Sequence, residues 1–537
     1  MSDQQTWLQG AVIYQIYPRS FYDSLGTGVG NLRGIIDKLD YLAGTPESLG
    51  ITAIWISPIY SSPMADFGYD VSNYIDVDPI FGTLEDMDKL IYEAHKRSIK
   101  VLLDFIPNHT SVEHPWFIES RSSPSSAKRD WYLWRDPGAN GGPPNNWLSV
   151  FGGSAWELDE QSGQYYLHSF LAKQPDLNWD NEAVREAMKS AMRFWLDHGV
   201  DGFRVDAVDW ISKDAALRDD PVDEHAIDKV PGYDHRSLRH IYSRDGPNLF
   251  DRLNEMTTVL EEYTDRFMIT EAHPESDDKI TGYLRYYQSV NPHLSAPFNF
   301  QGIHLPWKAS SFGRFIDTFQ AAMKPRYVPI YTLGNHDESR IATRVGSAEA
   351  RTAAVMLLTL PGVASIYYGE ELGMRDVTIS EGQVHDPFVG EQNSRDPERT
   401  PMQWSDVPQA GFTTATPWLP VSTDYQQVNV QTEIADPNSF LNLYRRLLKF
   451  RNHSSELQYG SYEPVNKHDQ ILGYERRHGK DALLVLLNFS DVSQELVLDN
   501  FRGTIVISTH LDAEGINVNK HLALRANEGV LIKVARD

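Results

Sequence analysis

The alternation of short apolar runs with amphipathic segments is the feature that most constrains the fold of this chain. Between Val12 and Tyr368, eight runs rich in β-branched or aromatic residues recur, and helical patterns follow most of them, for example at 84–97, 181–198 and 348–358. Such alternation predicts parallel strands joined by helices. We predict strands at residues 12–17, 53–57, 101–105, 202–206, 267–271, 296–300, 328–333 and 364–368. Eight parallel strands inside a ring of helices indicate an α/β fold of the (β/α)₈ type, the TIM barrel.

Two long segments interrupt the alternation. The first is rich in Trp, Pro, Gly and Asn and follows the third strand, and the second runs from 371 to about 420. Insertions of this length usually form small domains or functional loops. After a helical pattern at 439–451, short alternating strands predict a C-terminal antiparallel β-domain. We therefore predict a barrel at 1–109 and 174–455 (domain A), an inserted domain at 110–173 (domain B) and a C-terminal domain at 456–537 (domain C).

The charge balance limits the partners. The chain has 49 Lys and Arg against 74 Asp and Glu, which gives a formal net charge of −25. Such acidity argues against nucleic acid and anionic membrane surfaces as partners. No cysteine is present, so the fold does not depend on disulfides. We find no apolar run of about 18 residues either, and we expect a cytoplasmic protein that acts on small molecules as a monomer or homodimer.

Charged and polar side chains occur where four of the predicted strands end. They lie at 104–109, 204–206, 271–273 and 335–337. The carboxyl ends of barrel strands converge on one face, so these residues are expected to share a site although they are far apart in sequence. A single ion pair in a strand is often structural, but four such strand ends together indicate an active site.

Three carboxylates in this set, Asp206, Glu271 and Asp337, suit glycosidic bond cleavage, which needs two carboxyl groups of unlike protonation. Arg204 is on the same strand face as Asp206 and is expected to keep it ionised. Glu271 is then expected to keep a proton. A separation of about 5 to 5.5 Å between the two carboxyls would retain the anomeric configuration, and about 6.5 Å or more would invert it.

These strand ends resemble the conserved regions of glycoside hydrolase family 13, the α-amylase family, and residues 174–178 resemble a fifth conserved region. The resemblance extends over essentially the whole chain. It implies a (β/α)₈ barrel, a domain B in the third loop and a domain C that is an antiparallel β-sandwich. It also implies that Asp206 is the nucleophile, Glu271 the acid/base and Asp337 the transition-state stabiliser.

Within the family, residues 11–21 and 66–70 resemble the oligo-1,6-glucosidase and α-glucosidase branch, whose members cut from the non-reducing end. The resemblance implies that Asp66 and Arg399 pair at the bottom of the pocket and that Tyr69 stacks on the terminal glucose. By the same resemblance, the hydroxyl groups of that glucose are held by His109, Arg204 and His336.

The first loop departs from the family pattern. Related enzymes bind a divalent ion there through four regularly spaced oxygen ligands, whereas this chain offers Asp23, Thr27 and Asn31, with Leu25 at a ligand position. The loss of carboxylates removes most of the charge compensation that a Ca or Mg ion needs. We expect no required cofactor and a degraded metal site.

Ala207 follows the expected nucleophile directly. In this branch valine at that position accompanies α-1,6 preference, and smaller residues accompany α-1,4 preference. The sequence therefore predicts a retaining, exo-acting α-glucosidase for maltose-like substrates, with transglucosylation. Three alternatives stay open: an oligo-1,6-glucosidase, a sucrose isomerase or trehalose synthase that uses the same covalent intermediate, and a catalytically inactive binding protein. Residues 338–344 do not resemble the Arg-Leu-Asp-Arg-Asp signature of sucrose isomerases.

Overall fold

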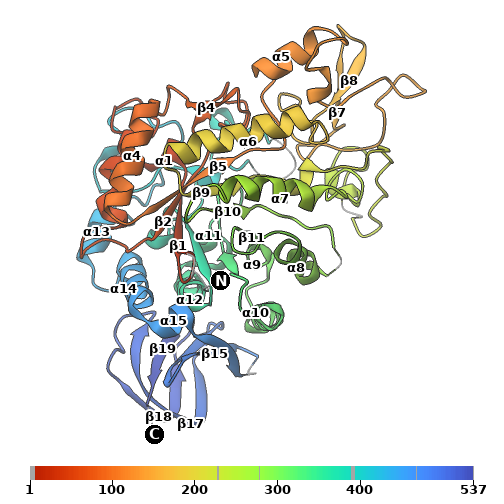
Figure 1. Cartoon of the computed structure of the whole chain (residues 1–537). Coiled ribbons are helices and arrows are strands. Elements are labelled where there is room, and N and C mark those ends of the chain that lie inside the picture. The colour runs from red at the N-terminus through yellow and green to blue at the C-terminus, as the bar shows by residue number, and fades with distance from the viewer. Residues whose placement is uncertain (1–6, 227–228, 277, 389–393, 467–468, 536–537) are drawn as a thin grey trace.

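A computed structural model describes residues 7–226, 229–276, 278–388, 394–466 and 469–535 (Figure 1). Eight parallel strands close into a barrel in the order β1-β13-β12-β11-β10-β9-β5-β2. All eight predicted barrel strands are confirmed. Their bounds are β1 Val12–Ile16, β2 Ala53–Ile56, β5 Lys100–Phe105, β9 Gly202–Val205, β10 Phe267–Thr270, β11 Ser295–Asn299, β12 Ile330–Thr332 and β13 Val363–Tyr367.

The barrel strands are buried on both faces, which explains their continuous apolar character. Every residue of β2, with the sequence Ala-Ile-Trp-Ile, is buried, and so is every residue of β13. A strand between a packed barrel interior and an outer layer of helices has no face for solvent. A charged residue within such a strand therefore needs a buried partner, and Arg204 in β9 is the main case.

The helices that cover the barrel begin at recognisable caps. Thr83 and Asp86 form a reciprocal capping box at the start of α4 (Leu84–Lys96), and the Asn181 side chain caps α6 (Glu182–Asp197). These side chains satisfy backbone N–H groups that lack a partner in the first helical turn. The three predicted helices are confirmed. The principal outer helices after α6 are α7 Leu249–Leu260, α8 Lys279–Ser289, α10 Ala309–Ala322 and α12 Ser347–Thr359.

The segment after β5 forms a small domain B, at the opposite end of the molecule from the C-terminal sheet (Figure 1). It contains α5 (Pro115–Ser122) and a three-stranded antiparallel sheet, with a core built around Trp147 and Trp156. The bounds of its strands are β6 Trp134–Arg135, β7 Trp156–Asp159 and β8 Gln164–Leu167. Backbone bridges join His109 to Asp176 and Tyr132 to Leu177, so domain B is fastened where β5 ends.

The predicted C-terminal antiparallel domain is confirmed, but its strands form one six-stranded sheet in the order β14-β15-β16-β19-β17-β18, whereas a sandwich has two. Residues 495–498 and 504–508 each have the alternating pattern of a separate short strand in the sequence, but both belong to one long strand, β17. Its register shifts between Leu498 and Arg502, and such an irregularity bends a strand without ending it. The bounds are β14 Ser461–Asn466, β15 Ile471–His478, β16 Asp481–Asn488, β17 Gln494–Ser508, β18 Asn517–Leu524 and β19 Gly529–Val534.

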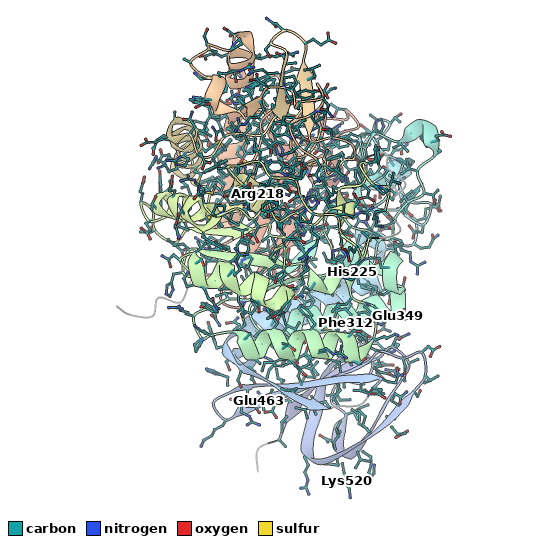
Figure 2. All side chains as sticks on the ribbon, turned by 90° about the vertical axis from the view of Figure 1, so that its right-hand side faces the viewer. Arg218, His225, Phe312, Glu349, Glu463 and Lys520 are labelled. Atoms are coloured by element: carbon teal, nitrogen blue, oxygen red, sulfur yellow. The ribbon has the colours of Figure 1, made fainter. Side chains whose placement is uncertain are left out.

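This sheet packs against α10, α12 and α15 (Ser455–Tyr459), and α14 (Phe440–His453), which precedes α15, packs on α12. Phe312 of α10, labelled in Figure 2, lies at this junction with its ring 5.7 Å from that of Phe489. Of the helices in the ranges described above, none combines the length and apolar character needed to cross a membrane. The cytoplasmic location and the oligomeric state stay predictions.

Candidate active site

A cavity of about 630 Å³ opens where the barrel strands end. The three predicted catalytic carboxylates line it together, although they follow three different strands: Asp206 after β9, Glu271 after β10 and Asp337 after β12. Asp66, Tyr69 and His109 line the same cavity. Arg204, His336 and Arg399 are buried and contact the carboxylates that form its wall.

Arg204 organises the centre of this cavity. Its Nη1 lies 2.6 Å from Asp206 Oδ1 and 2.8 Å from Asp104 Oδ1, and its Nη2 lies 2.8 Å from Glu271 Oε2. The guanidinium also lies over the Trp55 ring, 4.9 Å from its centroid. A planar guanidinium can bind several carboxylates in fixed directions. Arg204 therefore balances the charges of three buried carboxylates and fixes the orientation of two predicted catalytic groups.

The backbone turns sharply after Asp206. Ala207 is in the left-handed region, with φ 46° and ψ 42°, and its N–H donates to Glu271 Oε2 at 3.0 Å. This conformation costs an alanine about 1 kcal/mol. The turn links the backbone beside Asp206 to the Glu271 carboxylate, whose other oxygen, Oε1, lies 3.5 Å from His273 Nε2.

Two arginines surround Asp337, and here one prediction is wrong. Arg399 Nη2 binds Asp337 at 2.7 Å and its Nε donates to the His336 carbonyl oxygen at 2.6 Å, so Arg399 does not pair with Asp66. Asp66 pairs with Arg395, at 2.8 Å. Arg395 lies just before the short helix η6 (Asp396–Arg399), and that turn of chain places Arg395 against Asp66 and Arg399 against the His336 carbonyl oxygen, while both reach Asp337.

Arg395 also contacts Asp337 at 3.0 Å and Asp386 at 2.8 Å, so one guanidinium joins three carboxylates. Burial opposes the ionisation of Asp337, but His336, Arg395 and Arg399 outweigh it and hold the pKa of Asp337 well below its usual range. Asp337 is therefore a fixed negative charge in the cavity.

Tyr69 and His336 form a stacked pair, with ring centroids 5.4 Å apart and planes within 6°. The Tyr69 hydroxyl donates to Asp104 Oδ2 at 3.0 Å and lies 2.6 Å from His336 Nε2. Burial lowers the pKa of His336 to about 3 and that of His109 to about 4. Both imidazoles are consequently neutral near pH 7 and suited to hydrogen bonding with hydroxyl groups.

The electrostatic environment of the central pair differs from the sequence-based expectation. Burial raises the pKa of Asp206 well above its ordinary value, and the charge of Glu271 adds to this shift against Arg204. Burial also acts on Glu271, but Arg204 and His273 outweigh it and lower the pKa of Glu271 to about 2. These shifts favour the ionised form of Glu271 over that of Asp206, which is opposite to the sequence-based expectation. The reason is that Arg204 and the Ala207 N–H both favour the ionised form of Glu271.

Comparison with known proteins identifies the family. The family model for the alpha amylase catalytic domain matches residues 15–460. The chain belongs to the α-amylase family. A probable alpha-glucosidase from Rhizobium meliloti is 41% identical over 96% of each chain, and an oligo-1,6-glucosidase from Parageobacillus thermoglucosidasius is 37% identical over 99% of each. A trehalose-6-phosphate hydrolase from Bacillus subtilis is 35% identical over 100% of this chain and 99% of its own.

Solved structures agree with this assignment. The fold matches that of an alpha-glucosyl transfer enzyme with a TM-score of 0.91 at 37% identity, over 99% of this chain and 100% of the other. A trehalulose synthase from Pseudomonas mesoacidophila matches with a TM-score of 0.89 at 33% identity, again over 99% and 100%. This α-amylase family member is thus a glycoside hydrolase whose substrates are small carbohydrates.

The outer wall of the cavity comes from loops that the sequence did not assign to the site. Domain B supplies Phe151 and Phe170, whose ring centroids are 6.5 Å apart. Phe388, from the insertion after β13, meets Phe151 edge-on with the ring centroids 5.2 Å apart. The remaining outer residues that the sequence did not assign to the site are Val150, Trp210, His235, Arg236, Arg244, His304 and Glu338. These positions carry no strand-end signal, and only the tertiary fold brings them together.

The first loop of this family member is not arranged for a hard cation. Asp23 Oδ1 accepts hydrogen bonds from the backbone N–H groups of Leu25 and Gly26, and its Oδ2 accepts from Gly28 N and from Thr413 Oγ1. The Asn31 amide nitrogen also donates to Asp23 Oδ1, at 3.2 Å. A carboxylate surrounded by donors has no oxygen free to ligate a metal. The hydrogen bonds of Asp23 are consistent with the expectation of a degraded metal site at Asp23, Thr27 and Asn31, which stays a prediction.

Proposed function

We propose that this glycoside hydrolase is a retaining, exo-acting α-glucosidase for short α-glucosides that also transfers glucose to sugar acceptors. The observation that carries the proposal is a buried network around Asp66 in the cavity wall. There Asp66 binds Arg395 at 2.8 Å and accepts from Gln174 Nε2 at 3.1 Å, and that same amide nitrogen lies 3.2 Å from His109. A chain that continued past the innermost sugar would have to break this buried network. A single terminal glucose fits the arrangement better than an internal segment of a polysaccharide.

The proposed mechanism uses the three carboxylates in sequence. An Asp206 carboxylate oxygen bonds to the anomeric carbon while the glycosidic oxygen leaves with the bonding electrons and takes a proton from Glu271. Asp337 stabilises the positive charge that develops on the sugar ring. Glu271 then removes a proton from water, whose oxygen displaces Asp206 and completes hydrolysis. If a sugar hydroxyl takes the place of water, the product is a transferred glucoside.

The linkage preference rests on Ala207, whose small side chain lines the cavity beside Asp206. We infer an α-1,4 preference with maltose-like substrates. An oligo-1,6-glucosidase is the nearest alternative, since a relative of that name is 37% identical over almost the whole chain. Parallel initial rates on maltose, isomaltose, sucrose, trehalose and maltotriose distinguish the two.

If the departing sugar, instead of water, captured the glucosyl enzyme, the protein would be an isomerase. The structural likeness to a trehalulose synthase is the reason to consider this alternative. A product mixture from sucrose dominated by an isomerised disaccharide would support it.

A phosphorylated substrate is less favoured, because each arginine that lines the cavity already binds carboxylates. Arg236 binds Asp234, Arg244 binds Asp209 and Glu275, and Arg395 binds three acids.

The decisive test is Asp206→Asn assayed on p-nitrophenyl α-glucoside. A neutral amide cannot attack the anomeric carbon, so we expect activity to fall by about 10³-fold or more. Proton NMR of the first product with the wild-type enzyme should show α-glucose before mutarotation. Retained activity in Asp206→Asn, or β-glucose as the first product, contradicts the proposed mechanism.

A further inference from the structure

His273 lies beside the oxygen of Glu271 that must deliver the proton. Glu271 Oε2 is occupied, because it binds Arg204 Nη2 at 2.8 Å and accepts from Ala207 N at 3.0 Å. Glu271 lines the cavity, and its Oε1 lies 3.5 Å from His273 Nε2. Because two donors already engage Oε2, Oε1 is the oxygen left to give a proton to a leaving group, and His273 is a titratable group next to that atom.

The imidazole of His273 is held in place yet open to solvent. Its ring stacks on Phe300, with centroids 5.2 Å apart and planes within 15°. Phe300 follows β11, so the stack fixes His273 against the neighbouring barrel strand. About half of the His273 side chain, 48%, is exposed, because the residue lines the cavity. His273 can therefore exchange protons with water while its Nε2 stays directed at Glu271.

Arg204 creates the need for such a group. The Arg204 guanidinium and the Ala207 N–H both stabilise the ionised form of Glu271, so a lone Glu271 in this position would lose its proton well below neutral pH. A general acid works best when its proton is retained near the working pH. The geometry thus leaves the predicted acid without a proton unless a neighbour holds one.

On the basis of the proposed α-glucosidase function, we propose that His273 and Glu271 form a dyad that holds the catalytic proton jointly. His273 is the positioning residue of this dyad, and Glu271 is the group that touches the glycosidic oxygen. As the bond from the anomeric carbon to that oxygen breaks, the electron pair leaves with the oxygen and Asp206 bonds to the carbon. Glu271 Oε1 delivers the proton and His273 restores it. In the second step, water releases one proton to the dyad as its oxygen replaces Asp206.

The charges around His273 are consistent with a shared proton. Burial in the cavity wall disfavours the charged imidazole, but Glu271 and Asp209 outweigh it and raise the pKa of His273 above its ordinary value. Arg244 opposes this shift. The charge of His273 also affects two other residues that line the cavity. It disfavours the charged form of His304 and favours the ionised form of Glu338. When two interacting groups share one proton, the pair loses that proton at a higher pH than the weaker base would lose it alone.

The test is the pH dependence of kcat/KM for the wild type and His273→Gln on two substrates. With maltose, whose leaving group needs a proton, we expect the basic limb of the profile to move down by about one pH unit or more in His273→Gln. With p-nitrophenyl α-glucoside, whose leaving group departs as a stable anion, we expect a smaller shift.

The matched control is His198→Gln, which removes a histidine from another His–carboxylate pair, with Asp88 at 2.6 Å on the outer surface. We expect its profile to coincide with that of the wild type. His273→Asn serves as a second variant, and an unchanged melting temperature excludes misfolding of either. Coincident basic limbs in the wild type and both His273 variants would overturn the dyad. A wild type that hydrolyses neither substrate would instead refute the proposed function.

Discussion

At the scale of single residues, Arg395 has the largest predicted effect after the three carboxylates. Its guanidinium contacts Asp66, Asp337 and Asp386, and each of these acids would lose a buried partner in Arg395→Gln. Truncating one partner of a buried ion pair typically costs about 3–5 kcal/mol. We expect kcat/KM on maltose to fall by about 100-fold or more, with a raised KM. Arg375→Gln, at an exposed position bonded to Ser347, is the control. Equal kinetics for the two variants would contradict a role for Arg395 in the site.

Ala207 supports a second prediction at this scale. Valine is β-branched and tolerates positive φ poorly, so Ala207→Val should lower the melting temperature by a few degrees, about 1–2 kcal/mol in free energy of unfolding. It also narrows the cavity beside Asp206. We expect the ratio of isomaltose to maltose hydrolysis to rise at least several-fold in initial-rate assays. Ala207→Gly should leave that ratio closer to the wild-type value, and a ratio unaffected by valine would remove the basis for the linkage proposal.

Elements of the fold were predictable to different degrees. The strands β2 and β13 were evident because burial on both faces imposes a continuous apolar run. The strand ends that carry Asp206 and Glu271 were evident because charges interrupt such runs. The sequence could not predict which arginine reaches Asp66. Arg395 and Arg399 are separated by one helical turn, and the direction of that turn in the fold determines which guanidinium lies beside Asp66. The outer wall, with Phe151 and Phe388, depends on how two insertions fold over the barrel.

Domain B gives a prediction at the scale of elements. Asp176 is fully buried at the base of this domain, accepts from Asn108 Nδ2 and Ser169 N, and binds Lys213 Nζ at 2.9 Å. Burial raises the pKa of Asp176, but Lys213 and the hydrogen bonds outweigh this and keep it ionised. Lys213→Met would leave a buried carboxylate without its counter-ion.

We expect hydrogen exchange in Lys213→Met to quicken within residues 110–173 and to stay unchanged in the barrel strands, because the lost ion pair fastens domain B locally. Activity should decline with it, since domain B supplies Phe151 and Phe170 to the cavity. Lys189→Met, which removes a surface pair with Glu186, is the matched control. If residues 110–173 exchanged at the same rate in Lys213→Met as in the wild type, the ion pair between Lys213 and Asp176 would not be what holds domain B in place.

At the scale of the whole molecule, buried carboxyls outside the cavity control the response to alkali. Burial raises the pKa of Glu398 to about 9 and that of Glu433 to about 8. As the pH rises from 6.5 to 8.5, the folded protein keeps most of the Glu398 proton and loses the Glu433 proton near pH 8, whereas the unfolded chain has already lost both. Stability therefore falls as pH rises through this window. The buried neutral histidines do not reverse the trend, because their contribution is complete once the pH exceeds their unfolded pKa.

We expect the melting temperature to decrease from pH 6.5 to 8.5, and to decrease less in Glu433→Gln. Glutamine keeps an acceptor for Leu441 N, which Glu433 binds at 2.9 Å, but it has no proton to lose. Calorimetry at three pH values measures both slopes. A slope that is the same in the two proteins would mean that Glu433 is ionised in the folded state.

The C-terminal sheet lies at the end of the molecule opposite domain B, below α10 and α12 (Figure 1), while the cavity lies where domain B joins the barrel. This separation of the C-terminal sheet from the cavity matters when the enzyme is immobilised on a support. A resin or electrode coupled to β18 or β19 would carry the protein with its sugar-binding mouth directed toward the liquid. Coupling through domain B would turn that mouth against the support.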